Sequence, residues 1–132
     1  MMIPPGALVA VVDGQKLAMF RNTAHEGVTL AAVPTPAVAE AGAASLGHHS
    51  SSANPDKATQ AEDGFAAGVA AVLNGQALAG KLDALVVVAA PKTLGELRKH
   101  WHKVLEAKLV GEIAKDLTGQ SAEQVAAVIA KA

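Results

Sequence analysis

The chain has 132 residues, of which 51% are hydrophobic and 17% are charged, and it contains no cysteine. This length and balance predict a single globular domain over residues 1–132 and exclude a disordered chain, while the lack of cysteine excludes disulfides and thiol chemistry. The formal net charge of −1 gives no overall field that would draw the protein to nucleic acid or to an anionic membrane. Any such contact would therefore need a local basic surface.

Three short strands are predicted in the first quarter of the chain. Residues 7–12 form a continuous apolar run that ends at Asp13-Gly14, a dipeptide typical of β-hairpins. Residues 16–21 partly alternate between apolar and polar side chains, and residues 28–33 form a third run that is closed by a proline. Strands joined by such tight turns predict an antiparallel meander.

The hydrophobic pattern stops between residues 35 and 54, where Ala, Gly, Ser and His dominate. A stretch of this length without a hydrophobic period predicts a mobile loop. Residues 54–56, Asn-Pro-Asp, are typical of a helix start, and apolar residues at helical spacing then continue to Leu78.

Strands and helices alternate in the second half of the chain. We expect an apolar strand at 84–89, an amphipathic helix at 93–105, a strand at 109–113, and a final helix that begins with a capping box of Ser121 and Gln124. Residues 106–115 also fit a continued helix, which leaves the last strand open. The predicted order β-β-β-α-β-α-β-α requires parallel pairing in the second half. It gives a three-layer α/β domain with a mixed five-stranded sheet, the layout called ribonuclease-H-like.

Several segments of the chain together carry a family resemblance. They are Asp13-Gly14 with Phe20, then Phe65-Ala66, and above all the tail formed by residues 83–91, 94–98 and 115–118. In these segments the chain resembles the bacterial host-attachment protein family, described as proteins required for attachment to host cells. That family is similar to the central domain of archaeal and eukaryotic peptide-chain release factors, so the resemblance implies a ribonuclease-H-like fold. It covers most of the chain and weakens between residues 35 and 56.

Release-factor domains of this type carry a Gly-Gly-Gln motif on the loop before their long helix, where it promotes hydrolysis of peptidyl-tRNA. The corresponding residues here, 35–55, contain no glutamine. The near match is Asn74-Gly75-Gln76 at the predicted end of the long helix, where Asn and Gly are favoured because they tolerate left-handed backbone. The resemblance therefore carries over the fold and not the activity.

A candidate acidic site consists of Asp13 at the end of the first strand and of Glu62 and Asp63 on the long helix. A nuclease of the ribonuclease H type needs several carboxylates around two metal ions. The strand at 84–89, however, is followed by Ala90 and a proline and offers no acid. For Asp13 the hairpin turn is therefore the preferred role.

No metal or other cofactor is expected from the histidines. His100 and His102 are two residues apart on a predicted helix, so they point to different sides. The pair His48-His49 has no flanking acid or cysteine at the spacing of metal ligands.

The candidate binding surface is the predicted helix around residues 92–103. Glu96 is its one acid, and its basic residues are Lys92, Arg98, Lys99 and Lys103. All of these except Arg98 are spaced as one stripe, which could contact phosphates, RNA or an acidic partner. A solvated helix face gives the same pattern and stays open as the simpler interpretation.

Trp101 is the only tryptophan of the chain and falls in phase with Leu94 and Leu97. A large aromatic side chain in this phase is expected to pack against the sheet. Its replacement by alanine in a fully buried site would lower the free energy of unfolding by about 3–5 kcal/mol.

The sequence thus predicts a non-catalytic, cytoplasmic binding module that contacts RNA, the ribosome or a protein partner. A hydrolase of RNA or peptidyl-tRNA on the same fold is the alternative, and an adhesion-related factor is a third hypothesis. The N-terminus lacks the pattern of a secretory signal, and no apolar run approaches the ~20 residues of a membrane helix. Any effect on attachment is therefore expected to be indirect, and formation of a homo-oligomer is left open.

Overall fold

The structure of the protein is a computed structural model that describes residues 1–38 and 57–132. The elements in these residues are, in chain order, β1 (Leu8–Val12), β2 (Leu17–Asn22), β3 (Leu30–Ala32), α2 (Lys57–Leu78), β4 (Leu85–Ala89), α3 (Pro91–Arg98), α4 (Lys103–Glu106), β5 (Leu109–Ala114) and α5 (Ala122–Lys131). The predicted succession is confirmed, except that two short helices replace the single helix that was expected after β4.

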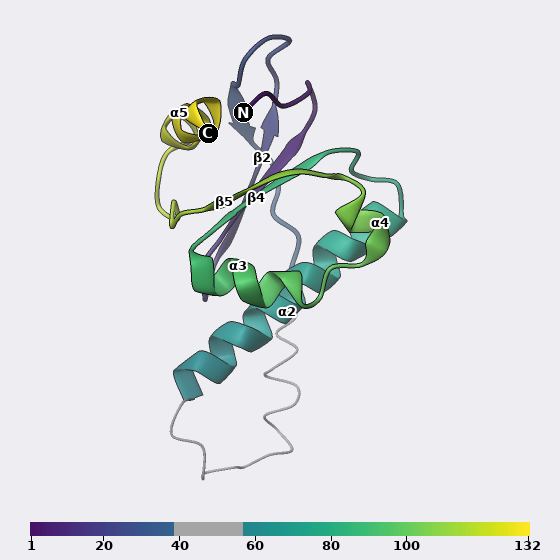
Figure 1. Ribbon diagram of the computed structural model, residues 1–132, viewed down its shortest axis with the longest axis vertical. Helices are drawn as coiled ribbons and strands as arrows, with labels where there is room; N and C mark the ends of the chain where they lie inside the picture. The colour runs from purple at the N-terminus through teal and green to yellow at the C-terminus, as the bar shows by residue number, and fades with distance from the viewer. Residues whose placement is uncertain (39–56) are drawn as a thin grey trace.

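The five strands form one mixed sheet in the order β3-β2-β1-β4-β5 (Figure 1). β1 pairs antiparallel with β2, and β2 pairs antiparallel with β3, as predicted for the meander. β1 pairs in parallel with β4, and β4 pairs in parallel with β5. The predicted α/β class and mixed five-stranded sheet are therefore confirmed.

Helices lie on both faces of the sheet, which gives three layers (Figure 1). α2, α3 and α4 share one face, where Leu97 and Leu105 belong to the same core cluster as Val87 of β4. α5 lies on the other face, where Ile129 belongs to a second core cluster with Val9 of β1. β1 and β4 are buried over their whole length between these two cores. This position explains why both strands are uniformly apolar.

The prediction of one continuous helix at 93–105 is wrong. α3 ends at Arg98, and α4 begins only at Lys103. His102 between them has extended backbone, and its Nδ1 accepts a hydrogen bond from the N–H of Val104 at 3.1 Å. A side chain that accepts from the second residue of a helix acts as its N-cap, so a new helix begins here although the apolar period runs on without interruption.

The third strand is shorter than predicted, at Leu30–Ala32 instead of 28–33. The side-chain oxygen Oδ1 of the buried Asn22 accepts from the N–H of Thr29 at 3.0 Å and from the N–H of Ala24 at 3.2 Å. The Asn22 amide thus satisfies backbone groups of the turn that would otherwise need strand pairing.

Two alternatives that the sequence left open are now decided. The long helix is not ended by Asn74 and Gly75, because α2 continues through them to Leu78, as the apolar spacing predicted. The strand predicted at 109–113 is confirmed and the alternative of a helix at 106–115 is excluded, because most of this stretch forms β5 and pairs with β4.

Some expectations fall outside the described residues. These are residues 39–54 of the predicted loop and the predicted helix start at 54–56. Residues 35–38 have no regular secondary structure. In the part of the chain that the structure describes, no helix combines the length and apolar character needed to cross a membrane.

Candidate functional site

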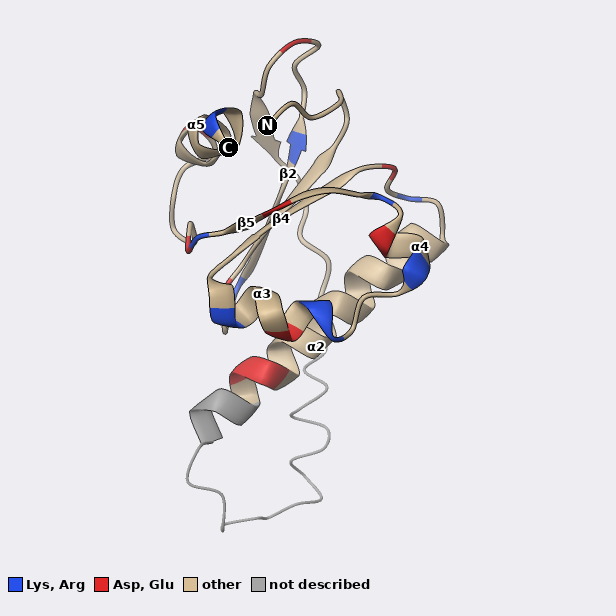
Figure 2. Ribbon diagram, in the orientation of Figure 1, with Lys and Arg blue, Asp and Glu red and all other residues tan. Residues whose placement is uncertain are grey.

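The basic residues predicted as a binding surface are all exposed, and they lie in α3, in α4 and between these two helices. Figure 2 colours basic residues blue and acidic residues red along these elements. Leu94 and Leu97 of α3 and Leu105 of α4 are buried, so they hold the two short helices against the core and leave their polar sides outward. The residues of this surface, called here the α3–α4 surface, are Lys92, Arg98, Lys99 and Lys103.

The predicted single stripe of Lys92, Glu96, Lys99 and Lys103 is wrong. Lys99 follows the last residue of α3, and Lys103 belongs to a second helix with its own cap. The four basic residues therefore spread over two helices and the residues between them, which makes a broader surface than one helical row.

Arg98 forms a two-pronged ion pair with Glu112 of β5. Its Nη2 lies 3.1 Å from Oε1 of Glu112, and its Nε lies 3.2 and 3.3 Å from the two carboxylate oxygens. The Arg98 side chain is 57% exposed, whereas that of Glu112 is 24% exposed. The bond ties the end of α3 to the edge strand and leaves the guanidinium on the solvent side.

The position of Glu112 depends on an irregularity in the sheet. The register between β4 and β5 shifts after Leu85, which pairs with Leu109, so that Val86 pairs with Gly111 and Val87 with Glu112. Val87 faces the helix-side core, and its partner Glu112 therefore faces α3. Without the extra residue Val110, Glu112 would turn to the opposite face. Sequence reasoning missed Glu112 because no local signal marks such a bulge.

Glu96 holds two basic neighbours. Its carboxylate lies 2.9 Å from Nζ of Lys99 and 3.5 Å from Nε2 of His100. The hydrogen bond from Lys99 is the main cause that lowers the pKa of Glu96 below its ordinary value, and the same bond raises the pKa of Lys99. Glu96 is 18% exposed and Lys99 is 69% exposed. Glu96 and Glu112 are thus less exposed than Lys99 and Arg98, the cations with which they pair, whereas Glu106 of α4 is exposed.

Asn74 of α2 fixes the residues between α3 and α4. Its Nδ2 donates to the carbonyl oxygen of His100 at 2.8 Å, and its Oδ1 accepts from the N–H of His102 at 2.9 Å. One amide thus bridges a donor and an acceptor of a segment that has left the helix, and it satisfies both. Sequence reasoning saw Asn74 only as a helix end, because the contact joins residues of different helices.

We expect Asn74→Ala to lower the free energy of unfolding by about 1–2 kcal/mol, because two backbone groups lose their partner. Hydrogen exchange at the amide of His102 should accelerate as well. Gly75→Ala is the matched control. It should raise stability by up to about 1 kcal/mol, because alanine is favoured over glycine in a helix and a Cβ at Gly75 meets nothing within 4 Å. Denaturant unfolding measures both variants, and equal stability of the two would contradict the role of Asn74.

The three candidate acids serve different partners. Oδ1 of Asp13 accepts from the N–H of Gln15 at 2.7 Å and from the N–H of Lys16 at 2.5 Å, which confirms its predicted role in the hairpin turn. Glu62 lies against this turn, because a Cβ added to Gly14 would stand 2.5 Å from Cγ of Glu62.

Asp63 instead adds to the field that raises the pKa of Lys99, so it lies on the side of α3. Within residues 1–38 and 57–132, no three His, Cys, Asp or Glu side chains are grouped so that they could hold a metal ion. Asp13, Glu62 and Asp63 are thus not gathered into one metal-ligating cluster.

No protein with a curated description matches the chain. The model of a family described as bacterial archaeo-eukaryotic release factor family 12 matches residues 6–129, which is nearly the whole chain. This match confirms the release-factor part of the resemblance seen in the sequence. The chain belongs to bacterial archaeo-eukaryotic release factor family 12.

Proposed function

We propose that this domain is a non-catalytic binding module whose α3–α4 surface contacts RNA, alone or in the ribosome. The observation that carries the proposal is the depth of the charges. Glu96 and Glu112 are 18% and 24% exposed, while Lys99 and Arg98 are 69% and 57% exposed. At Arg98 and Lys99, a phosphate that approaches from solvent therefore meets the cation before the carboxylate that pairs with it. Membership of a release-factor family supports RNA over other phosphate-bearing partners.

The ion pairs also prepare this surface for phosphate. Arg98 uses Nε and Nη2 for Glu112, and an arginine has further N–H donors in its planar fork. A guanidinium that is already held in place loses less side-chain freedom when it meets a second anion. Glu112 thus acts as a positioning residue for Arg98 in this proposal.

A non-catalytic role is supported by what the candidate catalytic groups do. Oδ1 of Asp13 is engaged by the hairpin turn. The near match to the release-factor motif lies inside α2, where Asn74 holds the residues between α3 and α4 and Oε1 of Gln76 is buried. A buried amide oxygen inside a helix is not placed to reach a peptidyl-tRNA ester.

The proposal is tested by the salt dependence of RNA binding. Replacing Lys99 and Lys103 together by glutamine should flatten the slope of log affinity against log salt by about one to two units. Each phosphate contact that is lost lowers the number of counterions released on binding. Both lysines are exposed, so stability should stay within about 0.5 kcal/mol. Binding of oligouridylate and of an RNA hairpin is measured by fluorescence anisotropy at several salt concentrations.

The matched control replaces Lys115 and Lys131 by glutamine; both are exposed but lie outside α3 and α4. This control variant changes the net charge by the same amount and should leave the salt slope closer to that of the wild type. Equal effects of the two double variants would show that binding follows net charge and not this surface. If the wild type binds neither RNA at low salt, the RNA proposal is wrong and a protein partner takes its place.

The rival function is hydrolysis of RNA or peptidyl-tRNA. It is tested by incubating the protein with each substrate in the presence and absence of Mg²⁺ or Mn²⁺. Metal-dependent cleavage that is lost in Asp13→Asn would contradict the non-catalytic role and support hydrolysis instead.

Three broader expectations also stay proposals. A ribonuclease-H-like layout is supported by the meander β1–β2–β3 and the parallel pairing of β1, β4 and β5. A cytoplasmic location and an indirect part in host attachment are the other two, and they rest on the sequence pattern and its family resemblance.

A further inference from the structure

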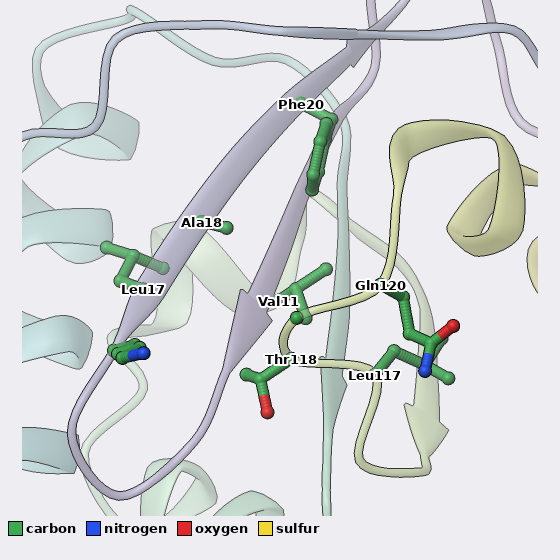
Figure 3. A pocket seen from close by; sticks show the side chains of 9 residues that line it. Val11, Leu17, Ala18, Phe20, Leu117, Thr118 and Gln120 are labelled. Atoms are coloured by element: carbon green, nitrogen blue, oxygen red, sulfur yellow. The ribbon is translucent and has the colours of Figure 1, made fainter.

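A pocket lies on the face of the sheet opposite to α3 and α4. α5 is the only helix among the described residues on this face, and it contacts the edge strand β3. Toward the hairpin end of β1 and β2, the cover comes from the turn at residues 117–120 instead (Figure 3). The pocket lies between the strands and this turn, and its volume is about 300 Å³.

The pocket has an apolar floor and a polar rim. Val11 of β1 and Ala18 and Phe20 of β2 point toward the turn at 117–120 (Figure 3), and Leu117 adds an apolar wall. The rim consists of Lys16, Thr118, Gly119 and Gln120. Lys16 is the only charged residue among those that line the pocket.

The turn on the rim is built from local hydrogen bonds. Asp116 accepts from both the N–H and the hydroxyl group of Thr118, which lowers the pKa of Asp116, and the N–H of Gln120 donates to the carbonyl of Leu117 at 3.1 Å. Gly119 has a φ of +81°, a conformation that L side chains rarely adopt. Since the Asp116 carboxylate is turned onto Thr118, it does not line the pocket.

We propose that this pocket binds a small amphipathic carboxylate, whose apolar body lies on Val11, Ala18 and Phe20 and whose carboxylate group pairs with Lys16. Ligand pockets span roughly 300–1,000 Å³, so this one suits a compound with a short aliphatic or single-ring body. The site is separate from the α3–α4 surface, and its ligand does not depend on the function proposed there.

The charge adds selectivity and the apolar floor adds affinity. Lys16 is exposed, and an exposed ion pair changes binding by only about two- to five-fold. Removal of an apolar body from water provides the larger part. A carboxylate should therefore bind a few-fold more tightly than a neutral compound of the same shape.

The experiment titrates the protein with sodium hexanoate and, separately, with hexanamide, and follows backbone amides by two-dimensional NMR. We expect hexanoate to shift the amides of Val11, Ala18 and residues 118–120 and to bind about two- to five-fold more tightly than hexanamide. Lys16→Gln should remove this preference, while the distant Lys131→Gln should keep it.

Ala18→Leu fills the pocket and should abolish binding of both compounds, with a thermal melt to show that the variant is folded. Should it not fold, the loss of preference in Lys16→Gln carries the test, because that residue is exposed. The proposal is overturned by equal affinity for the two compounds, by shifts confined to other parts of the protein, or by no binding of either compound.

Discussion

Replacing Leu97 by alanine is expected to lower the free energy of unfolding by about 2–5 kcal/mol. Leu97 has no exposed surface and belongs to the helix-side core together with Leu73 and Leu105. Its truncation removes apolar contacts within this core and leaves a cavity that rigid strands cannot fill. Denaturant unfolding followed by far-ultraviolet circular dichroism measures the change.

The matched control is Leu78→Ala at the end of α2. Leu78 is 57% exposed, so the same chemical change should move stability by no more than about 0.5 kcal/mol. A loss below about 1 kcal/mol for Leu97→Ala would mean that α3 is not anchored in the core. The α3–α4 surface would then lack the rigid support on which its proposed function depends.

Replacing Trp101 by alanine is expected to lower the free energy of unfolding by about 2–3 kcal/mol, which is less than for a fully buried aromatic residue. Trp101 does pack against the helix-side core, as expected from its phase, but it is partly exposed and lies between α3 and α4. Circular dichroism must follow the unfolding, because the variant has no tryptophan left to report by fluorescence.

Trp101→Phe separates the ring from its polar group. The indole Nε1 of Trp101 is buried and has no hydrogen-bond partner among the described residues. Phenylalanine keeps most of the apolar contact and removes this N–H, so its cost should stay below about 1 kcal/mol. A loss as large as that of Trp101→Ala would show that the N–H has an acceptor after all.

Several elements could be predicted because their signals are local. The apolar run at 84–89 predicted a strand buried on both faces, and β4 is buried over its whole length. The Asp13-Gly14 dipeptide predicted a hairpin, and Asp13 closes that turn with its side chain. The capping box of Ser121 and Gln124 is present in both directions.

For the candidate site, the sequence predicted the types of residue but not how they are arranged. The basic residues are exposed as expected, but Lys99 lies outside both helices and the single stripe does not exist. Helical periodicity could not reveal the break after Arg98, because the buried leucines of α3 and α4 keep the same spacing. Asn74, which holds the intervening residues, belongs to another helix.

The sequence by itself thus determined the class of the fold, the order of its elements and the hairpin and capping turns, because each signal lies within a few neighbouring residues. The tertiary structure decided the pairing of Arg98 with Glu112, 14 positions away, and the contact of Asn74 with His102, 28 positions away. It also decided the pocket above β1 and β2. These features depend on sheet register and on which helix covers which face, and a one-residue shift in register reverses the side on which a strand residue lies.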